Sequence, residues 1–197
     1  YEETGVVPEY DHEYFFVDLY GQYKFTPTSL LRLTAKYFSR RYSDRPSYDL
    51  DGRQRLGNPA VRYDYYSVGL RARQRITDSM WFGLDVERTD RTDQYVGYND
   101  YTLDSYRFDF QWTFRERFDL DVKAIYRNYD YVNAFAFHNP VAGRKTLETA
   151  EASIIGTYRM TENLSLVGEI RYRDTASNDT RIQYERNQYI LGVRWQQ

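Results

Sequence analysis

The sequence contains no cysteine, which excludes disulfide bonds, thiolate metal sites and cysteine nucleophiles. It has no long hydrophobic run either: a membrane-spanning helix needs about 18 consecutive apolar residues, and apolar stretches such as 134–137 are far shorter. The net charge of −2 leaves the chain without an overall basic field that would attract nucleic acid. The chain starts at Tyr1 without a signal peptide, so we expect a mature, trimmed or partial chain.

Tyrosine, by contrast, is abundant. Aromatic residues make up 18% of the 197 residues, with 22 Tyr, 11 Phe and 3 Trp, while 28% of residues are charged. The mean hydropathy is −0.82. A soluble core built mainly from tyrosine is unfavourable, because each buried hydroxyl needs a hydrogen-bond partner. Tyrosine suits a membrane interface, and a low mean hydropathy is compatible with a membrane β-barrel, in which only alternate strand residues face lipid.

Apolar and polar residues alternate with a period of two in about nine segments of the chain. The clearest segment is 106–115, where Tyr106, Phe108, Phe110, Trp112 and Phe114 alternate with Arg107, Asp109, Gln111, Thr113 and Arg115. A helical period fits these segments less well. The pattern predicts β-strands of about 12–15 residues, longer than the about 5–6 residues usual in globular sheets.

The connections between these segments alternate in length. Short turns are expected at 26–28, 77–79, 115–117 and 160–163, and longer polar loops near 43–61, 89–100, 130–146 and 174–182. Short turns at one end and long loops at the other are typical of the periplasmic and extracellular ends of an outer-membrane barrel. We therefore predict an all-β fold, an antiparallel up-and-down transmembrane β-barrel in the bacterial outer membrane of a Gram-negative cell.

A soluble sandwich or lipocalin-like barrel with its apolar face inward is the alternative. Arginine-rich alternate positions, unequal loops and aromatic residues at the strand ends favour the membrane fold. Phe15 and Phe25 are ten positions apart on one face, which spans about 25 Å of membrane at a tilt of about 40°. We expect an aromatic girdle at the membrane interface near the short turns, made of Tyr23, Phe25, Trp112, Phe114, Phe118, Tyr158 and Trp195.

The number of strands raises a question about completeness. If the chain ends in the periplasm, the ninth and the first strand both run downward, whereas bacterial single-chain barrels have an even number of strands. An unpaired edge is not viable in lipid. We expect residues 1–197 to form a single outer-membrane β-barrel domain that is the C-terminal part of a larger, even-stranded barrel.

The polar alternate face is expected to line the lumen, with cations outnumbering acids. The predicted pore-lining residues are Lys24, Arg32, Lys36, Arg40, Arg71, Arg73, Arg75, Asp85, Glu87, Arg107, Asp109, Arg115, Asp119, Asp121, Lys123, Arg127, Glu169, Arg171, Arg173 and Arg194. Arginine rings of this kind can select anionic or heavily hydroxylated cargo, and cross-strand ladders of arginine and acid can equally stiffen the wall. Arg71, Arg73 and Arg75 exceed the nearby acids Asp85 and Glu87, so they are the best candidates for a selectivity patch.

Signs of catalysis are few. His12 and His138 lie outside the strand centres, and no serine stands beside His138 as an acyl-transfer site requires. The acidic segments 49–52 and 178–179 lack the spacing of a calcium-binding loop and suit ordinary turns. We expect no enzymatic activity, no metal site and no cofactor.

The last third of the chain resembles the closing hairpin of the Putative beta-barrel porin 2 family. The resemblance is carried by Leu164–Asp174, Ser177–Asp179, Tyr184–Asn187 and Leu191–Trp195. Members are similar to outer-membrane barrels, some of them associated with exopolysaccharide export. Gln196 and Gln197 depart from the usual pattern, in which a barrel ends on an aromatic residue read by the assembly machinery.

Three functions remain open at this point. The leading one is transport, through a porin-like channel for polysaccharide or other anionic or hydroxylated cargo. The second is a structural barrel that sheathes a partner such as a multihaem cytochrome, and the third is a loop-based adhesin or outer-membrane enzyme. The expected partners are outer-membrane lipid and lipopolysaccharide, the barrel-assembly machinery and a periplasmic export or cytochrome partner, with no nucleic acid.

Overall fold

The computed structural model describes residues 11–195, and it is built almost entirely of β-strands. No helix in this range is long and apolar enough to span a membrane. Two short 3₁₀ turns, Ala136–His138 and Pro140–Ala142, interrupt one loop. The nine strands are β1 (His12–Thr26), β2 (Ser29–Pro46), β3 (Ala60–Thr77), β4 (Met80–Asp93), β5 (Tyr101–Phe114), β6 (Phe118–Phe135), β7 (Arg144–Arg159), β8 (Leu164–Ser177) and β9 (Tyr184–Trp195).

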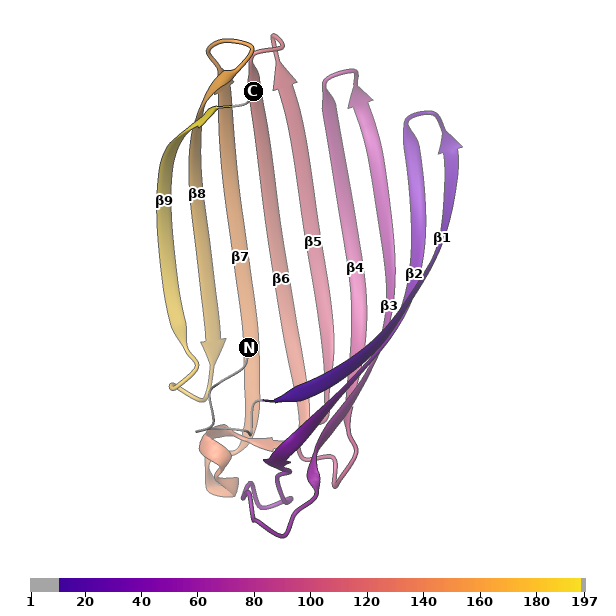
Figure 1. Cartoon of the computed structure of the whole chain (residues 1–197), viewed down its shortest axis with the longest axis vertical. Coiled ribbons are helices and arrows are strands. Elements are labelled where there is room, and N and C mark those ends of the chain that lie inside the picture. The colour runs from indigo at the N-terminus through magenta and orange to yellow at the C-terminus, as the bar shows by residue number, and fades with distance from the viewer. Residues whose placement is uncertain (1–10, 196–197) are drawn as a thin grey trace.

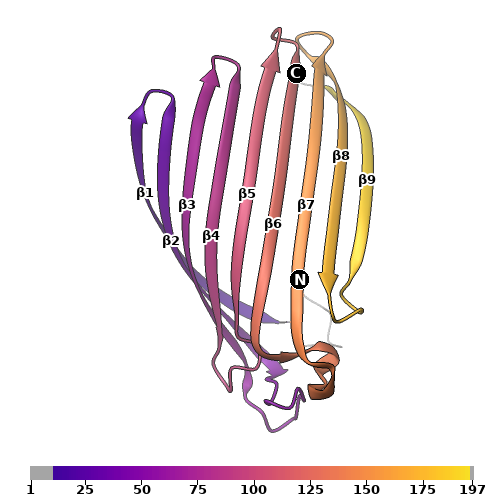
Figure 2. The same cartoon turned by 180° about the vertical axis from the view of Figure 1, so that it is seen from behind.

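The strands form one antiparallel sheet in sequence order, each strand paired with the next. Figures 1 and 2 show a tall curved wall, with the short turns at the end where β1 and β3 finish and the long loops at the other end. Among residues 11–195 no pairing joins β9 back to β1, so the wall is open. The predicted all-β, antiparallel up-and-down architecture is confirmed, and three strands reach 18 residues, longer than expected.

The strand register sorts the side chains onto two faces. Phe110 lies between Phe82 and Val122 on the neighbouring strands, and the next residue, Gln111, lies between Trp81 and Asp121. Because side chains alternate across a strand, the register extends each apolar or polar position into a row across the sheet. Toward the short turns one face is therefore apolar across all nine strands and the other carries the charged residues, whereas near the loops the apolar face also bears charges such as the Arg88–Asp104 pair.

The predicted girdle residues share the apolar face near the short turns. Tyr23 packs against Phe25 with ring centroids 4.8 Å apart, and Trp112 against Phe114 at 5.2 Å. Phe114, Phe118 and Tyr158 lie opposite one another on β5, β6 and β7, and Trp195 lies opposite Leu164. A row of aromatic side chains on one face is what an interfacial girdle requires.

A second group of tyrosines on the apolar face, nearer the loops, reports the strand tilt. Tyr66 on β3 and Tyr189 on β9 both belong to this group. The residue of β3 in the same register row as Tyr189 is, however, Gln74, which is displaced from Tyr66 along the strand. If the tyrosines mark one membrane plane, a displacement of about eight residues over about six strands corresponds to a tilt of about 40°. That tilt lies within the range of transmembrane barrels, so the rows of the register run obliquely to the membrane plane.

The only buried hydrophobic cluster found in residues 11–195 lies at the loop end, not within the sheet. Tyr98, Tyr131 and Ala134 are 0%, 8% and 3% exposed, and Tyr48 and Phe135 pack against them. The loops after β2, β4, β6 and β8 meet there and form a small cap. The sheet itself has two solvent-accessible faces, which is expected of a wall that meets lipid on one side and water on the other.

Candidate functional site

The charged face of the sheet is the candidate functional site. The predicted pore-lining residues all lie on this face except Arg115, which occupies the turn between β5 and β6. Arg115 has a φ of 50°, and its guanidinium lies 4.9 Å above the ring of Phe114 on the apolar face. It therefore belongs to the turn and the girdle.

Many of the charges on this face are paired. Asp85 accepts two hydrogen bonds from Arg71, with 2.6 Å between Nε and Oδ1, and Asp109 accepts two from Arg107 at 2.8 and 2.9 Å. Further ion pairs of this face are Arg127–Glu151, Arg173–Glu151, Arg159–Asp119 and Arg171–Glu169. The pairs that Arg71, Arg127, Arg159 and Arg173 form join neighbouring strands, as the ladder interpretation requires, whereas Arg107–Asp109 and Arg171–Glu169 are pairs within one strand.

One ion pair crosses a whole strand. Lys36 on β2 donates to Glu87 on β4 with 2.5 Å between Nζ and Oε2, passing over β3. Gly69 of β3 lies opposite both Thr34 and Glu87, and a Cβ there would come within 2.8 Å of the Thr34 hydroxyl. Because Gly69 has no side chain, the side chains of Lys36 and Glu87 have room to meet above β3.

The three arginines predicted as a patch behave differently from one another. Arg71 is tied to Asp85, and Arg75 pairs with Asp78 in the adjacent turn at 2.8 Å. Arg73, which lies between them in sequence, forms no ion pair or side-chain hydrogen bond with any residue of 11–195. Of the three, Arg73 is the charge without an ion-pair partner in residues 11–195.

Two adjacent rows across the middle of the face concentrate positive charge. One row runs from Lys24 through Arg73, Asp109 and Lys123 to Arg171, and the other from Arg32 through Arg71 to Arg186. Together they hold nine cations and three acids. The cations are Lys24, Arg32, Arg71, Arg73, Arg107, Lys123, Arg171, Arg173 and Arg186; the acids are Asp85, Asp109 and Glu151. We call these two rows the cationic belt.

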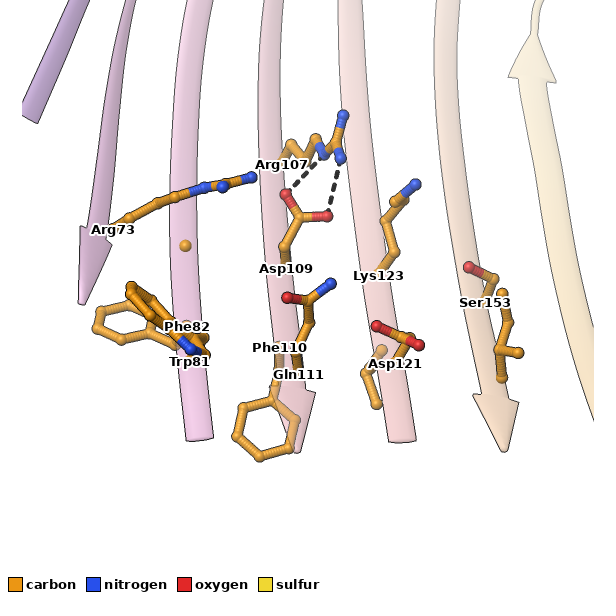
Figure 3. A pocket seen from close by; sticks show the side chains of 13 residues that line it. Arg73, Trp81, Phe82, Arg107, Asp109, Phe110, Gln111, Asp121, Lys123 and Ser153 are labelled. Atoms are coloured by element: carbon orange, nitrogen blue, oxygen red, sulfur yellow. Dashed lines mark hydrogen bonds and ion pairs between the residues drawn. The ribbon is translucent and has the colours of Figure 1, made fainter. Parts of the chain in front are cut away.

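A hollow of about 350 Å³ opens on the cationic belt between β3 and β7. Figure 3 shows Arg73 reaching across β4 toward the Arg107–Asp109 pair, with Lys123 on the far side. Gly83 of β4 lies opposite both Arg73 and Asp109, and its lack of a side chain leaves room between them. Three cations and two carboxylates, those of Asp109 and Asp121, therefore surround a water-accessible recess with a positive surplus.

The loop residues considered for catalysis or metal binding have structural partners. The ring of His138 stacks on Tyr48 with centroids 4.6 Å apart, and its Nδ1 lies 3.2 Å from the Tyr98 hydroxyl. Partial burial and the nearby cations Arg181 and Lys145 lower the pKa of His138. His12 lies at the start of β1 with its ring 5.3 Å from that of Tyr42. Both histidine rings thus pack against tyrosine rings of the loop end.

The aspartates of the acidic loop segments form ion pairs with arginines. Asp49 and Asp51 pair with Arg55, and Asp179 accepts hydrogen bonds from the Arg181 guanidinium and the Phe137 amide. The guanidinium of Arg181 holds the pKa of Asp179 well below its usual range. Within the described residues no group of three or more histidines, aspartates or glutamates could hold a metal ion.

An aromatic group that the sequence did not predict lies on the charged face, near the loops. The row Phe16, Phe38, Tyr65, Arg91, Tyr101 and Tyr131 crosses β1 to β6. The available signal was the doublets Phe15-Phe16, Tyr37-Phe38 and Tyr65-Tyr66, since one member of each doublet must face away from lipid. We call this row, with the adjoining Tyr14, Tyr63 and Tyr129, the aromatic tier.

Three solved structures are similar to this chain, and one of them, OmpT, supports the fold. OmpT, an outer membrane protein of Vibrio cholerae, superposes with a TM-score of 0.64 at 10% sequence identity, over 92% of this chain and 55% of that chain. The chain thus spans about half the length of OmpT. The NanC porin gives a TM-score of 0.46 at 12% identity over 94% of this chain and 96% of that chain. FpvA of P. aeruginosa bound to pyoverdine gives 0.48 at 13% identity over 94% and 34%.

Sequence comparison identifies the family. No curated protein matches the chain significantly. The model of the family described as Putative beta-barrel porin 2 matches residues 67–197, which is more than half of the chain. The chain belongs to this family, as its last third indicated, and it is a protein of the bacterial outer membrane.

Proposed function

We propose that this member of the Putative beta-barrel porin 2 family forms a porin-like channel that favours anionic, hydroxylated solutes. The observation that supports the proposal is the cationic belt, which holds nine cations and only three acids on the polar side of a transmembrane wall. Rings of charged side chains in a pore set ion preference, because a narrow, low-dielectric wall focuses their field on the solute.

The open wall of residues 11–195 requires further strands to form a closed pore. The strands β1 and β9 each carry one row of backbone groups without partners in the sheet, and unpaired backbone groups are costly in lipid. The superposition on about half of OmpT is compatible with a larger barrel. We propose that the nine strands are part of such a barrel, whose total strand number sets the pore diameter.

The test is planar-bilayer conductance of the full-length refolded protein, with the reversal potential measured in a potassium chloride gradient. We expect a stable open channel whose reversal potential shows preference for chloride. A reversal potential of zero or of the opposite sign in an open channel would contradict the proposal, and so would a protein that folds and inserts but never conducts.

A matched pair of variants locates the origin of the preference. Arg73→Glu places an acid in the hollow of the belt and should reduce or reverse the chloride preference. Arg62→Glu makes the same charge change on the same strand, with the side chain on the outer face near the loops, and should leave the preference close to that of the unmodified channel. Equal shifts in the two variants would show that the belt does not determine selectivity.

A further inference from the structure

The aromatic tier differs from the rest of the charged face. Elsewhere on this face the rows are mainly ion pairs and small polar residues, with single apolar side chains such as Leu30, Ile125 and Ile155 between them. The tier replaces them with rings from β1, β2, β3, β5 and β6 and a single arginine from β4. An aqueous lumen does not favour such a row, so another interaction must account for it.

The rings form a continuous series of contacts. Tyr14 lies 6.0 Å from Phe38, Phe38 lies 5.1 Å from Tyr65, and Tyr65 lies 6.4 Å from Tyr63, measured between ring centroids. The guanidinium of Arg91 then joins two of the rings, at 4.6 Å from Tyr63 and 4.1 Å from Tyr101. Tyr101 continues the series to Tyr131 at 5.4 Å. The series of contacts is therefore continuous from Tyr131 on β6 to Tyr14 on β1.

The tier also descends into the membrane. Its rings follow a row of the register, and rows run obliquely at a strand tilt of about 40°. Over about five strand spacings of about 4.8 Å each, the row falls by about 15 Å along the membrane normal. The β6 end, at Tyr131, is buried under the loop cap, whereas the β1 end, at Phe16, lies beside residues of the lipid band. The tier thus runs from the extracellular mouth into the channel.

The exposure of the rings changes along this path. Tyr131 and Tyr63 are 8% and 7% exposed and anchor the upper end, while Tyr14 and Phe16 are 65% and 63% exposed on the charged face. Phe38, Tyr65 and Tyr101 are half-buried. The lower part of the tier therefore offers ring surface to a molecule in the lumen, and the upper part holds that surface in place.

From this arrangement we infer that the aromatic tier is a binding track for the sugar rings of an oligosaccharide, which names the cargo class of the proposed channel and rests on that proposal. A pyranose ring has an apolar face of C–H groups and a rim of hydroxyls. The negative π-face of an aromatic ring attracts the slightly positive C–H groups. Tyrosine hydroxyls and the guanidinium of Arg40 beside Phe38 supply hydrogen-bond donors for the rim, while Arg91 donates to the Asn99 carbonyl and holds the rings around it in place.

The track favours a neutral or anionic saccharide over other amphipathic molecules. Arg40 lies 5.3 Å above Phe38, Arg91 lies between two tyrosines, and Lys145 lies 5.0 Å from the ring of Tyr131. Three cations along the rings disfavour a cationic ligand. An extended series of rings at similar spacings also suits a polymer of repeating rings better than a compact ligand.

The test is calorimetric titration of the full-length protein, refolded in detergent, with maltohexaose and separately with cellohexaose. We expect one or both to bind. The double substitution Phe38→Leu and Tyr65→Leu keeps apolar volume but removes two stacking rings, and it should weaken binding about tenfold or more. The single substitution Tyr65→Leu provides a milder variant in case the double variant folds poorly, which heat-modifiable gel mobility detects.

The chain provides a close control. Tyr37 and Tyr66 are the sequence neighbours of Phe38 and Tyr65, and their rings are also 5.1 Å apart, on the lipid face. Tyr37→Leu with Tyr66→Leu should leave saccharide binding unchanged. Failure of both hexasaccharides to bind at about 10 mM, or equal weakening in the two double variants, would overturn the track. Binding without conductance would instead contradict the channel proposal and leave the track standing.

Discussion

The two faces of the sheet differ most clearly at Ile154 and Ile155 of β7, which are identical residues on opposite sides. Ile154 lies between Val122 and Ile170 on the apolar face and is 47% exposed. Ile155 lies between Asp121 and Glu169 on the charged face. Their residue type says nothing about their surroundings, and the strand alternation decides everything. The effect of a side chain in this wall therefore depends first on which face of the sheet carries it and only then on its residue type.

The largest expected effect comes from putting the same charge on each face. Ile154→Arg places a guanidinium in the lipid band and should lower the free energy of unfolding by about 2–4 kcal/mol, the range known for arginine near the midplane of a barrel wall. Ile155→Arg should have a much smaller effect, because Asp121 and Glu169 flank the new charge. Urea unfolding in lipid vesicles measures both. Similar losses of unfolding free energy in the two variants would contradict the assignment of the two faces.

A smaller effect separates paired from unpaired charges within the charged face. Arg71→Met leaves the Asp85 carboxylate, 19% exposed, without its bidentate partner and should cost about 1 kcal/mol of unfolding free energy. Arg73→Met removes a charge that has no ion-pair partner in residues 11–195, so stability should change little while chloride preference falls more. Unfolding midpoints and reversal potentials on the same two variants test this. The opposite ranking would show that Arg71 serves the solute and Arg73 the wall.

The smallest effect concerns the loop cap that adjoins the charged face. The folded-state pKa of Asp179 is depressed by Arg181, so the stabilisation is complete above the ordinary pKa of 3.8 and is lost as the pH falls through the lowered value. Because Arg181 is 53% exposed, solvent screening keeps the contribution below about 1 kcal/mol.

Asp179→Asn should therefore loosen the cap at neutral pH and flatten its response to acid. Limited proteolysis of the loops at pH 7 and at pH 3 reports the change. The unmodified cap should be cleaved faster at the lower pH, after correction for protease activity on an unfolded substrate. An acid response of the same size in the asparagine variant would assign it to another group.

The sequence predicted the faces well and the pairings poorly. Period-two alternation placed Arg107 and Phe108 on opposite sides correctly, because the direction of a side chain depends only on the strand it belongs to. Arg71, Arg73 and Arg75 illustrate the limit. Their common face was predicted, but only the register with β4 and the following turn shows that Asp85 and Asp78 take two of them.

The same distinction separates what the sequence by itself determined from what only the tertiary structure decided. Composition and alternation determined an outer-membrane β-wall with an apolar and a charged face and with aromatic residues near the short turns, because these depend on local geometry and on the solvent each face meets. The Lys36–Glu87 bridge over Gly69, the cationic belt and the oblique aromatic tier depend on register and tilt. Register joins residues far apart in the chain, so it is a property of the assembled sheet.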